Sequence, residues 1–409
     1  MKAFFWYTLV FLVILAGCNT PSAKLKTGVW RGVLEIQEQQ LPFNFRVVND
    51  STGGLDVYIK NAREELLLDE VVFHDDSVDF ILHVFDAELR VAIHGDSLNG
   101  FFILNYRDNY RVPFRAAFGQ DFRFFKTDST TNVVDFSGTY QVRFTNENDT
   151  TRAIGMVQQR GSYAEGSFLT PSGDYRFLEG GVANDKLYLS TFDGNHLYLI
   201  TSTKQNDSTL AGDYWAGRTF HQAWTGTKTD NPQLPKTESL TYLKDGYDKI
   251  EFSFPDINGN KVSLTDEKYK NKVVILQILG TWCPNCMDET KFLVPWYTQN
   301  KDRGVEILGL AYERKDDFAY ASGRVKKMKE KWNIPYDFVI AGVDDKGKAS
   351  ATLPALSSIT AFPTTIFIGK DGKVKHIHTG FEGPGTGIYY QQYIERFNQI
   401  VNACLAEQQ

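Results

Sequence analysis

One segment constrains the fold of this chain more than any other: the run Trp-Cys-Pro-Asn-Cys at residues 282–286. The apolar run at residues 273–279 precedes it and is typical of a buried strand. A helical pattern follows, with Pro284 just inside its predicted start, where the missing proline N–H costs no hydrogen bond. Cys283 is therefore expected at a helix N-terminus, where unpaired N–H groups and the helix dipole favour a thiolate. Because a thiolate attacks disulfides, the segment predicts a redox centre.

Alternating strand and helix patterns extend over residues 249–409. We expect a hairpin at residues 250–264 with Asn258-Gly259 in its turn, followed by a βαβαββα order. Such an order is typical of a mixed sheet covered on both faces. The expected strands are 273–279, 305–311, 337–340, 365–368 and 374–378, and the expected helices are 284–299, 316–332 and 388–405.

The first half of the chain has a different pattern. Between residues 27 and 228, short runs of alternating apolar and polar residues are separated by Gly, Asn and Asp. This is typical of antiparallel sheet with one solvated face. The half also looks duplicated, because residues 27–32 resemble residues 137–142, and residues 96–101 resemble residues 207–214, about 110 residues apart in each case.

We therefore expect two related β units, at residues 27–126 and 132–228, each forming a small barrel or sandwich, or both closing one larger barrel. A polar linker joins them, and a second linker at residues 229–248 leads to the C-terminal domain. The predicted fold class is multidomain: an all-β duplicated region followed by an α/β domain with a mixed sheet.

The beginning of the chain predicts where the protein is found. An apolar stretch at residues 3–16 is shorter than the roughly 20 residues of a membrane-spanning helix, so we interpret residues 1–17 as a signal peptide. Its end, Leu-Ala-Gly followed by Cys18, resembles a bacterial lipobox, and this resemblance implies that Cys18 is lipidated. A plain secretory signal with an incidental Cys18 is the alternative. We expect a protein that is lipid-anchored to a bacterial membrane outside the cytoplasm, facing the periplasm, with inner and outer membrane both open.

Cysteine usage and charge narrow the classes of function. Four cysteines in 409 residues, one of them assigned to lipidation, are too few for a structural disulfide framework. A lone Cys-x-x-Cys pair without a nearby histidine is a poor zinc site. The net charge of -6 provides no basic footprint for nucleic acid. We expect no metal, no cofactor and no nucleic-acid partner.

Residues 249–409 resemble the thioredoxin-fold domain of the TlpA/ResA-like thiol–disulfide oxidoreductases. The resemblance is carried by Trp-Cys-x-x-Cys after a strand, by Phe-Pro-Thr at residues 362–364 before a late hairpin, and by the opening hairpin. It implies that Cys283 is the attacking thiol and Cys286 the resolving thiol, and that the two form a redox-active disulfide.

The same resemblance implies which residues meet the substrate. Pro363 corresponds to a cis-proline facing the disulfide, a role compatible with the near confinement of cis peptides to X-Pro bonds. An ordinary trans loop proline is the alternative. Phe362 and Thr364 flank it beside the substrate strand, and Trp282 shields the site.

Glu289 matches the acid that ResA-like proteins carry three residues after the second cysteine. On a helix this spacing places it on the same face as Cys286, and the resemblance implies that it shuttles a proton to the resolving thiol. The alternative is a solvated helix residue, since Asp288 beside it is also charged.

These features predict a disulfide reductase for exported proteins, whose partners are protein thiols or disulfides and a membrane or periplasmic electron donor. The order Pro284-Asn285 leaves the direction of electron flow open, because this dipeptide tunes the redox poise. A peroxiredoxin shares the fold but places a threonine three residues before its reactive cysteine, whereas Thr281 lies two before Cys283. In a third interpretation, the β half is a binding or docking module and the redox domain is accessory to it.

Overall fold

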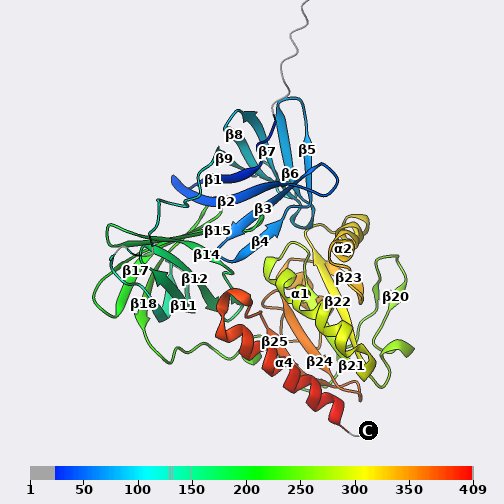
Figure 1. The fold of residues 1–409 in the computed structure, drawn as a ribbon. Coiled ribbons are helices and arrows are strands. Elements are labelled where there is room, and N and C mark those ends of the chain that lie inside the picture. Colours follow the sequence, from blue (N-terminus) through cyan, green and yellow to red (C-terminus); the bar gives the residue numbers. More distant parts are fainter. Residues whose placement is uncertain (1–23, 129, 131, 148, 408–409) are drawn as a thin grey trace, which may run out of the picture.

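A computed structural model describes residues 24–407 of the chain, apart from residues 129, 131 and 148. It contains two β units and a C-terminal α/β domain (Figure 1), in agreement with the predicted fold class. The predicted signal peptide and Cys18 lie outside the described residues. Within the described part of the chain, we find no helix whose length and apolar character suffice to cross a bilayer.

The first β unit is a nine-stranded antiparallel meander that curls into a half-barrel. Its first strand, β1 (Gly28–Ile36), pairs with its last strand, β9 (Arg111–Phe118). Aromatic side chains fill the space inside the curl, among them Phe43, Phe80 and Phe102. The other strands are β2 (Gln39–Asn49), β3 (Leu55–Asn61), β4 (Glu64–Leu67), β5 (Glu70–Phe73), β6 (Ser77–Leu82), β7 (Ala87–His94) and β8 (Ser97–Leu104).

The second β unit repeats this arrangement and closes it. Its first strand, β10 (Gly138–Thr145), again pairs with its last, β18 (Phe220–Lys228), which agrees with the predicted duplication. An additional pairing between β11 (Thr150–Arg160) and β12 (Tyr163–Thr170) completes a ring of strands, which removes the open sheet edges. The remaining strands are β13 (Gly173–Asp174), β14 (Leu178–Ala183), β15 (Lys186–Phe192), β16 (Leu197–Lys204) and β17 (Thr209–Ala216).

Alternation along β10 explains why these segments form strands with one buried face. Tyr140, Val142 and Phe144 are buried, whereas the residues between them are partly or fully exposed. Successive strand residues point to opposite faces, so this spacing directs every second side chain into the barrel.

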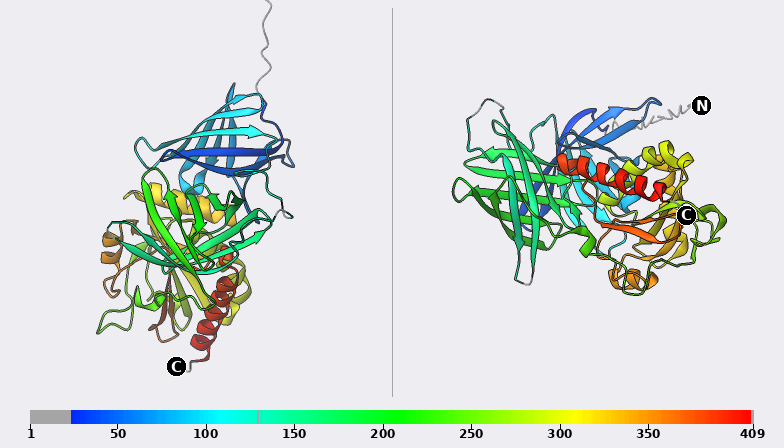
Figure 2. Two further views of the ribbon diagram at one scale, coloured as in Figure 1. Left: turned by 90° about the vertical axis from the view of Figure 1, so that its left-hand side faces the viewer. Right: turned by 90° about the horizontal axis from the view of Figure 1, so that it is seen from below.

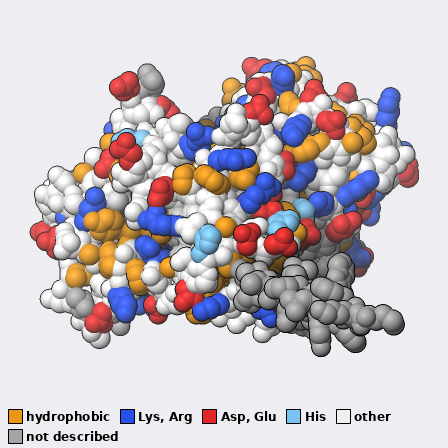
Figure 3. All heavy atoms as spheres, turned by 90° about the horizontal axis from the view of Figure 1, so that it is seen from above, with side chains coloured by type: hydrophobic (Ala, Val, Ile, Leu, Met, Phe, Trp, Pro, Cys, Tyr) orange, Lys and Arg blue, Asp and Glu red, His pale blue; other side chains and the backbone are white. Residues whose placement is uncertain are grey.

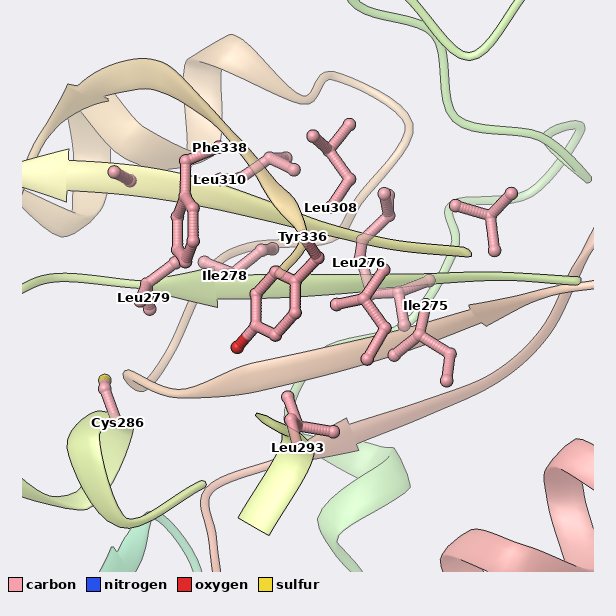
Figure 4. Close-up of a cluster of buried hydrophobic side chains, with 14 of the residues drawn as sticks. Ile275, Leu276, Ile278, Leu279, Cys286, Leu293, Leu308, Leu310, Tyr336 and Phe338 are labelled. Carbon is pink, nitrogen blue, oxygen red and sulfur yellow. The ribbon is translucent and has the colours of Figure 1, made fainter. Parts of the chain in front are cut away.

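The C-terminal domain is built on a mixed five-stranded sheet in the order β23-β22-β21-β24-β25. The central strand, β21 (Val273–Leu279), is buried along its whole length, as expected for a strand covered on both faces. Figure 4 shows its side chains in the domain core, with Cys286 at the edge of the cluster. The other elements are β22 (Val305–Glu313), β23 (Asp337–Val343), β24 (Thr364–Ile368), β25 (Val374–Thr379), α1 (Pro284–Asn300), α2 (Phe318–Trp332), α3 (Lys346–Thr352) and α4 (Ile388–Ala406).

Two details differ from the sequence prediction. The opening hairpin is reduced to β19 (Phe254–Pro255) and β20 (Lys261–Val262), and beyond its outer end the Ser263 N–H donates to the Asp266 carboxylate instead of to a partner strand. The short helix α3 is additional. Asp345 caps it by accepting the Lys348 N–H at 2.8 Å. It has too few apolar residues to show a helical period in the sequence.

The predicted linker at residues 229–248 is partly packed on the C-terminal domain. Leu243 forms a β-bridge with Leu356, and Thr241 is fully buried beside Thr360, whose hydroxyl lies 3.1 Å from its own. The C-terminal end of this segment is therefore held against the domain that follows it.

Two further views (Figure 2) show the C-terminal domain lying against both β units. The first unit contacts α2, where the Tyr320 hydroxyl donates to Asp86 at 2.8 Å and Lys331 pairs with Asp69. Val84 of this unit packs into the core of the C-terminal domain. On the face drawn in Figure 3, charged side chains of both signs are interspersed with apolar ones. The second unit contacts the N-terminus of α1, where the two cysteines lie.

Candidate active site

Cys283 is the N-cap residue of α1, as the sequence predicts. Its sulfur accepts the backbone N–H of Cys286 at 3.2 Å, and Pro284 occupies the first helical position. The Cys283 thiol also donates to the backbone carbonyl of Phe362, with an Sγ···O distance of 3.5 Å. The Cys283 sulfur therefore lies at the helix N-terminus, between the first turn of α1 and the proline loop.

Cys286 lies one helical turn deeper and differs in its surroundings. Both thiols are free, but Cys283 is 5% exposed whereas Cys286 is 0% exposed. Burial, followed by the hydrogen bond and charge of Cys283, raises the pKa of Cys286 well above its ordinary value, and the charge of Glu289 adds to this effect. Its surroundings therefore favour the protonated form of the inner thiol.

The proline loop faces the cysteines from the start of β24. The Phe362–Pro363 peptide bond is cis, in agreement with the expectation for Pro363. Trp282 packs edge-on against Phe362, with ring centroids 5.4 Å apart. Thr364 is fully buried, and its hydroxyl donates to the Ala361 carbonyl at 2.9 Å. Three of the four predicted substrate contacts therefore gather beside Cys283, while the Thr364 side chain is engaged within its own loop.

Glu289 is fully buried, so the alternative of a solvated helix residue is wrong. Its carboxylate accepts hydrogen bonds from Gln277 (2.9 Å), Thr365 (2.5 Å) and Tyr393 (3.0 Å). Burial raises the pKa of Glu289 above its ordinary value, although these three donors act in the opposite direction. The charge of Glu289 in turn contributes to the raised pKa of Cys286, so the two groups are close enough to influence each other's titration.

Gln277 was not among the predicted site residues, although the sequence carried a signal for it. It is the one polar residue in the apolar strand β21. Its amide donates to Glu289 and to the Thr290 hydroxyl (3.1 Å), and its carbonyl oxygen accepts from the Tyr336 hydroxyl at 3.3 Å. A polar side chain in a fully buried strand requires such partners, so its position in the run already indicated a buried polar network.

A second buried carboxylate, Glu313 at the end of β22, was also missed. It accepts the backbone N–H of Thr281 at 2.9 Å and the Thr281 hydroxyl at 2.8 Å. Burial raises the pKa of Glu313 to about 7. The neighbouring Trp282 donates its indole N–H to the Tyr312 carbonyl at 2.9 Å, so the end of β22 fixes the turn that precedes Cys283.

The β half supplies residues that no local sequence pattern connects to the cysteines. Asn285, between the two cysteines, donates its amide to the Asp174 backbone carbonyl (3.0 Å) and carboxylate (2.8 Å). Arg176 forms ion pairs with Asp288 on α1 (2.9 Å), Asp193 in the second β unit (3.1 Å) and Glu64 in the first (2.5 Å). This arginine is 2% exposed, so three parts of the molecule meet at one buried guanidinium.

These charges shift one another's titration. Burial alone would lower the pKa of Arg176, but the charges of Asp288, Glu64 and Asp193 outweigh it and raise the pKa. Burial and the charge of Asp288 raise the pKa of Asp174 to about 7. The active-site helix therefore begins in a buried, charged environment that the N-terminal half provides.

Comparison with known proteins agrees with this geometry. Residues 246–377 match the AhpC/TSA family. The thiol-disulfide oxidoreductase ResA of Geobacillus thermodenitrificans is 32% identical over 130 residues, which are 32% of this chain and 66% of that protein. The ResA of Bacillus thuringiensis subsp. konkukian is 30% identical over 129 residues, again 66% of its length. The chain thus spans slightly less than two thirds of these relatives.

Among solved structures, a thiol:disulfide interchange protein of the thioredoxin family from Chlorobium tepidum is similar to the C-terminal part. It is 22% identical and covers 40% of this chain and 100% of its own, with a TM-score of 0.30.

Proposed function

Since residues 246–377 form an AhpC/TSA-family domain with a thioredoxin fold, we propose that the protein is a thiol–disulfide oxidoreductase that works through Cys283 and Cys286. One observation carries the proposal: the Cys283 sulfur accepts the Cys286 N–H at 3.2 Å and lies 3.5 Å from the carbonyl that precedes the cis-proline. The proposed attacking sulfur is thereby placed beside a loop that is suited to hold a substrate backbone.

In the reductive direction, the Cys283 thiolate attacks one sulfur of a substrate disulfide. A mixed disulfide forms, the substrate S–S bond breaks, and the departing substrate thiolate takes up a proton. Cys286 then loses its proton and attacks the Cys283 sulfur. This step releases the second substrate thiol and leaves a Cys283–Cys286 disulfide, so two electrons have passed to the substrate. An exported or membrane-bound electron donor restores the dithiol, and the reverse sequence oxidises a substrate.

Glu289 is proposed as the proton acceptor for Cys286. The Cys286 thiol is fully buried and has a raised pKa, so it needs a nearby base before it can attack. The raised pKa of Glu289 makes this carboxylate a stronger proton acceptor than an ordinary glutamate, which supports transfer from the thiol. Trp282, Phe362 and Pro363 are proposed to contact the substrate.

We also propose that the protein acts outside the cytoplasm, anchored to a membrane by a lipid on Cys18. The support is the sequence of the leader and its resemblance to a lipobox. Mass spectrometry of the mature N-terminus tests this: we expect a diacylglyceryl-modified Cys18, and a Cys18→Ser variant that leaves the membrane fraction. An unmodified cysteine inside an intact N-terminus would contradict the anchor.

Reduction of insulin by the purified protein, with dithiothreitol as electron source, tests the central proposal. We expect activity that is abolished in Cys283→Ala and retained in Cys404→Ala, because Cys404 is buried in α4 away from the motif. A Cys286→Ala variant is expected to retain the natural partner as a mixed disulfide, which would identify the substrate.

The peroxidase alternative predicts peroxide consumption without insulin reduction. In a peroxidase we would expect a threonine hydroxyl to face the reactive cysteine. Thr281 instead directs its hydroxyl and backbone N–H to Glu313, which argues against that role.

A further inference from the structure

Residues 170–178 of the second β unit, which we name the cover segment, lie on the N-terminus of α1. Asp174 in this segment accepts both hydrogen bonds from the Asn285 amide. A Cβ atom added to Gly173 would lie only 3.1 Å from the Asn285 side-chain nitrogen. The cover segment therefore packs directly against the residue that separates the two cysteines.

The cover segment also reaches the loop that carries the cis-proline. Gly380 donates its N–H to the Pro363 carbonyl at 2.8 Å, and a Cβ atom at Gly380 would lie 2.7 Å from the carbonyl carbon of Ser172. The backbones at Gly380 and Ser172 are therefore so close that no side chain fits between them. The cover segment thus spans from the cysteine turn to the neighbourhood of Pro363.

Buried ion pairs hold the cover segment in this position. The Arg176 guanidinium pairs with Asp288 two residues after Cys286, and it is anchored within the β half by Asp193 and Glu64. A buried arginine with several carboxylate partners is costly to separate, because separation leaves each partner without compensation. The contact is therefore a defined structure rather than a loose surface encounter.

Thiol–disulfide exchange requires the attacking sulfur to touch a substrate sulfur. In this arrangement Cys283 is 5% exposed, Asn285 7% and Phe362 9%, so a disulfide held in a polypeptide must displace covering residues to reach the thiol. We infer that the cover segment determines the specificity of the redox site, with Asp174 and Arg176 as positioning residues. Small disulfides and thiols need only a slight opening, whereas a protein substrate must displace the cover segment from Asn285. This inference rests on the proposed function only in taking Cys283 as the attacking thiol.

Two reagents of equal chemistry and different size test the inference: N-ethylmaleimide and a polymer-linked maleimide, with modification of Cys283 followed by peptide mass spectrometry. The ratio of the two rates cancels any change in thiolate reactivity and reports access alone. In the reduced wild-type protein we expect the bulky reagent to be strongly disfavoured.

A larger side chain at Gly385 is expected to act as a wedge that pushes the cover segment away without altering any charge. A Cβ atom at Gly385 would lie 2.5 Å from the Arg176 carbonyl oxygen, and Gly385 does not have the left-handed backbone that would resist substitution. We expect Gly385→Leu to raise the bulky-to-small rate ratio by roughly tenfold or more, as expected when a closed population is shifted open. The matched control is Gly323→Leu on α2, where a Cβ atom meets nothing within 4 Å, and we expect no change.

A second pair of variants keeps the test decisive if the wedge disturbs folding. Asp174→Ala removes the side-chain acceptor for Asn285 and is expected to raise the ratio, whereas Asp174→Asn keeps an acceptor oxygen and is expected to stay near the wild-type ratio. Equal rates for both reagents in the wild-type protein, or an unchanged ratio in a folded Gly385→Leu or Asp174→Ala protein, would overturn the inference.

Insulin reduction by the same proteins separates this inference from the proposed function. If the bulky reagent is excluded as expected and no variant reduces insulin, the inference about the cover segment is supported and the proposed reductase function is wrong. If insulin is reduced while Cys283 reacts equally with both reagents, the proposed function is supported and the inference about the cover segment is wrong.

Discussion

The two β units share a strand order but meet the C-terminal domain in different ways. The first unit contacts α2 through partly exposed pairs such as Lys331–Asp69, in which the lysine side chain is 29% exposed. The second unit contacts α1 through Arg176, which is 2% exposed and has three carboxylate partners, one of them Glu64 of the first unit. Exposed pairs are weak and are screened by salt, whereas buried charges depend strongly on their partners. The comparison indicates that buried charges hold the contact beside the thiols, whereas the contact near α2 combines partly exposed ion pairs with the buried side chain of Val84.

The largest effect on stability is expected for Arg176→Met. We expect a loss of about 3–5 kcal/mol in the free energy of unfolding, because three buried carboxylates lose their common partner. Urea denaturation with circular dichroism measures it. Neutralising the partners as well, with Glu64→Gln, Asp193→Asn and Asp288→Asn, is expected to recover much of the loss. Equal instability of the single and combined variants would mean that packing, not charge, explains the effect.

A pH titration tests the buried contact next. The folded pKa of Asp174 is about 7, against an ordinary value of 3.8, so folding favours the protonated form. Its contribution to stability is therefore present at low pH and is lost as pH rises toward 7. Between pH 5 and pH 8 we expect the free energy of unfolding to fall by about 2–3 kcal/mol from this group. Glu313, with a pKa of about 7, acts in the same direction.

The control for that titration is Asp174→Asn, which cannot ionise. Urea midpoints at several pH values are expected to show a shallower pH dependence in this variant, with the remainder due to other buried carboxylates with raised pKa values, including Glu313 and Glu289. A pH dependence identical to that of the wild-type protein would show that Asp174 does not titrate in this range.

Two neighbouring carboxylates of α1 differ in what they contact. Asp288 pairs with Arg176 of the β half, whereas Glu289 faces the core of the redox domain. We expect Glu289→Gln to slow the resolution of a mixed disulfide by roughly tenfold at neutral pH. The carboxylate must be ionised to accept a proton, so the wild-type rate is expected to fall as pH decreases through its raised pKa. Glutamine removes this dependence.

Single-turnover kinetics between pH 6 and pH 9 measure this change, with Glu395→Gln on the exposed face of α4 as the matched control. The access of Cys283 to maleimides is expected to stay unchanged in Glu289→Gln. Unaltered kinetics across that range would refute the proton-acceptor role.

The smallest expected effect belongs to the first unit. Lys331→Ala removes a partly exposed ion pair with Asp69 and is expected to lower the free energy of unfolding by about 1 kcal/mol or less. Lys326→Ala, an exposed lysine on the same helix, serves as the control in the same denaturation experiment. A loss as large as that of Arg176→Met would remove the distinction between the two contacts.

Local patterns predicted much of the C-terminal domain. The apolar run at residues 273–279 is β21, and the cysteine helix ends at Asn300, one residue beyond its predicted end. These features depend on residues that are neighbours in the chain, where hydrophobic period and capping are visible. The short helix α3 was not visible, because its polar and small residues carry no such period.

Only the part of the site that lies within the C-terminal domain could be predicted, for a related reason. The thiols and the cis-proline are carried by a recognisable motif, whereas Arg176 meets partners at residues 64, 193 and 288. Those contacts depend on how three parts of the molecule pack against one another, and no spacing in the sequence encodes that packing. Gln277 lies between these cases: its polarity in an apolar strand was a visible signal, but its partner Tyr393 was not.

The order of synthesis gives the arginine contact one more consequence. Glu64, Arg176 and Asp193 all emerge before Asp288, so the N-terminal half can assemble an arginine with two of its carboxylates while the cysteine helix does not yet exist. Domains generally fold as units from the N-terminus. We therefore expect the nascent protein to present Arg176 already paired with two carboxylates, and α1 to complete the cluster by bringing Asp288 together with the newly made thiols.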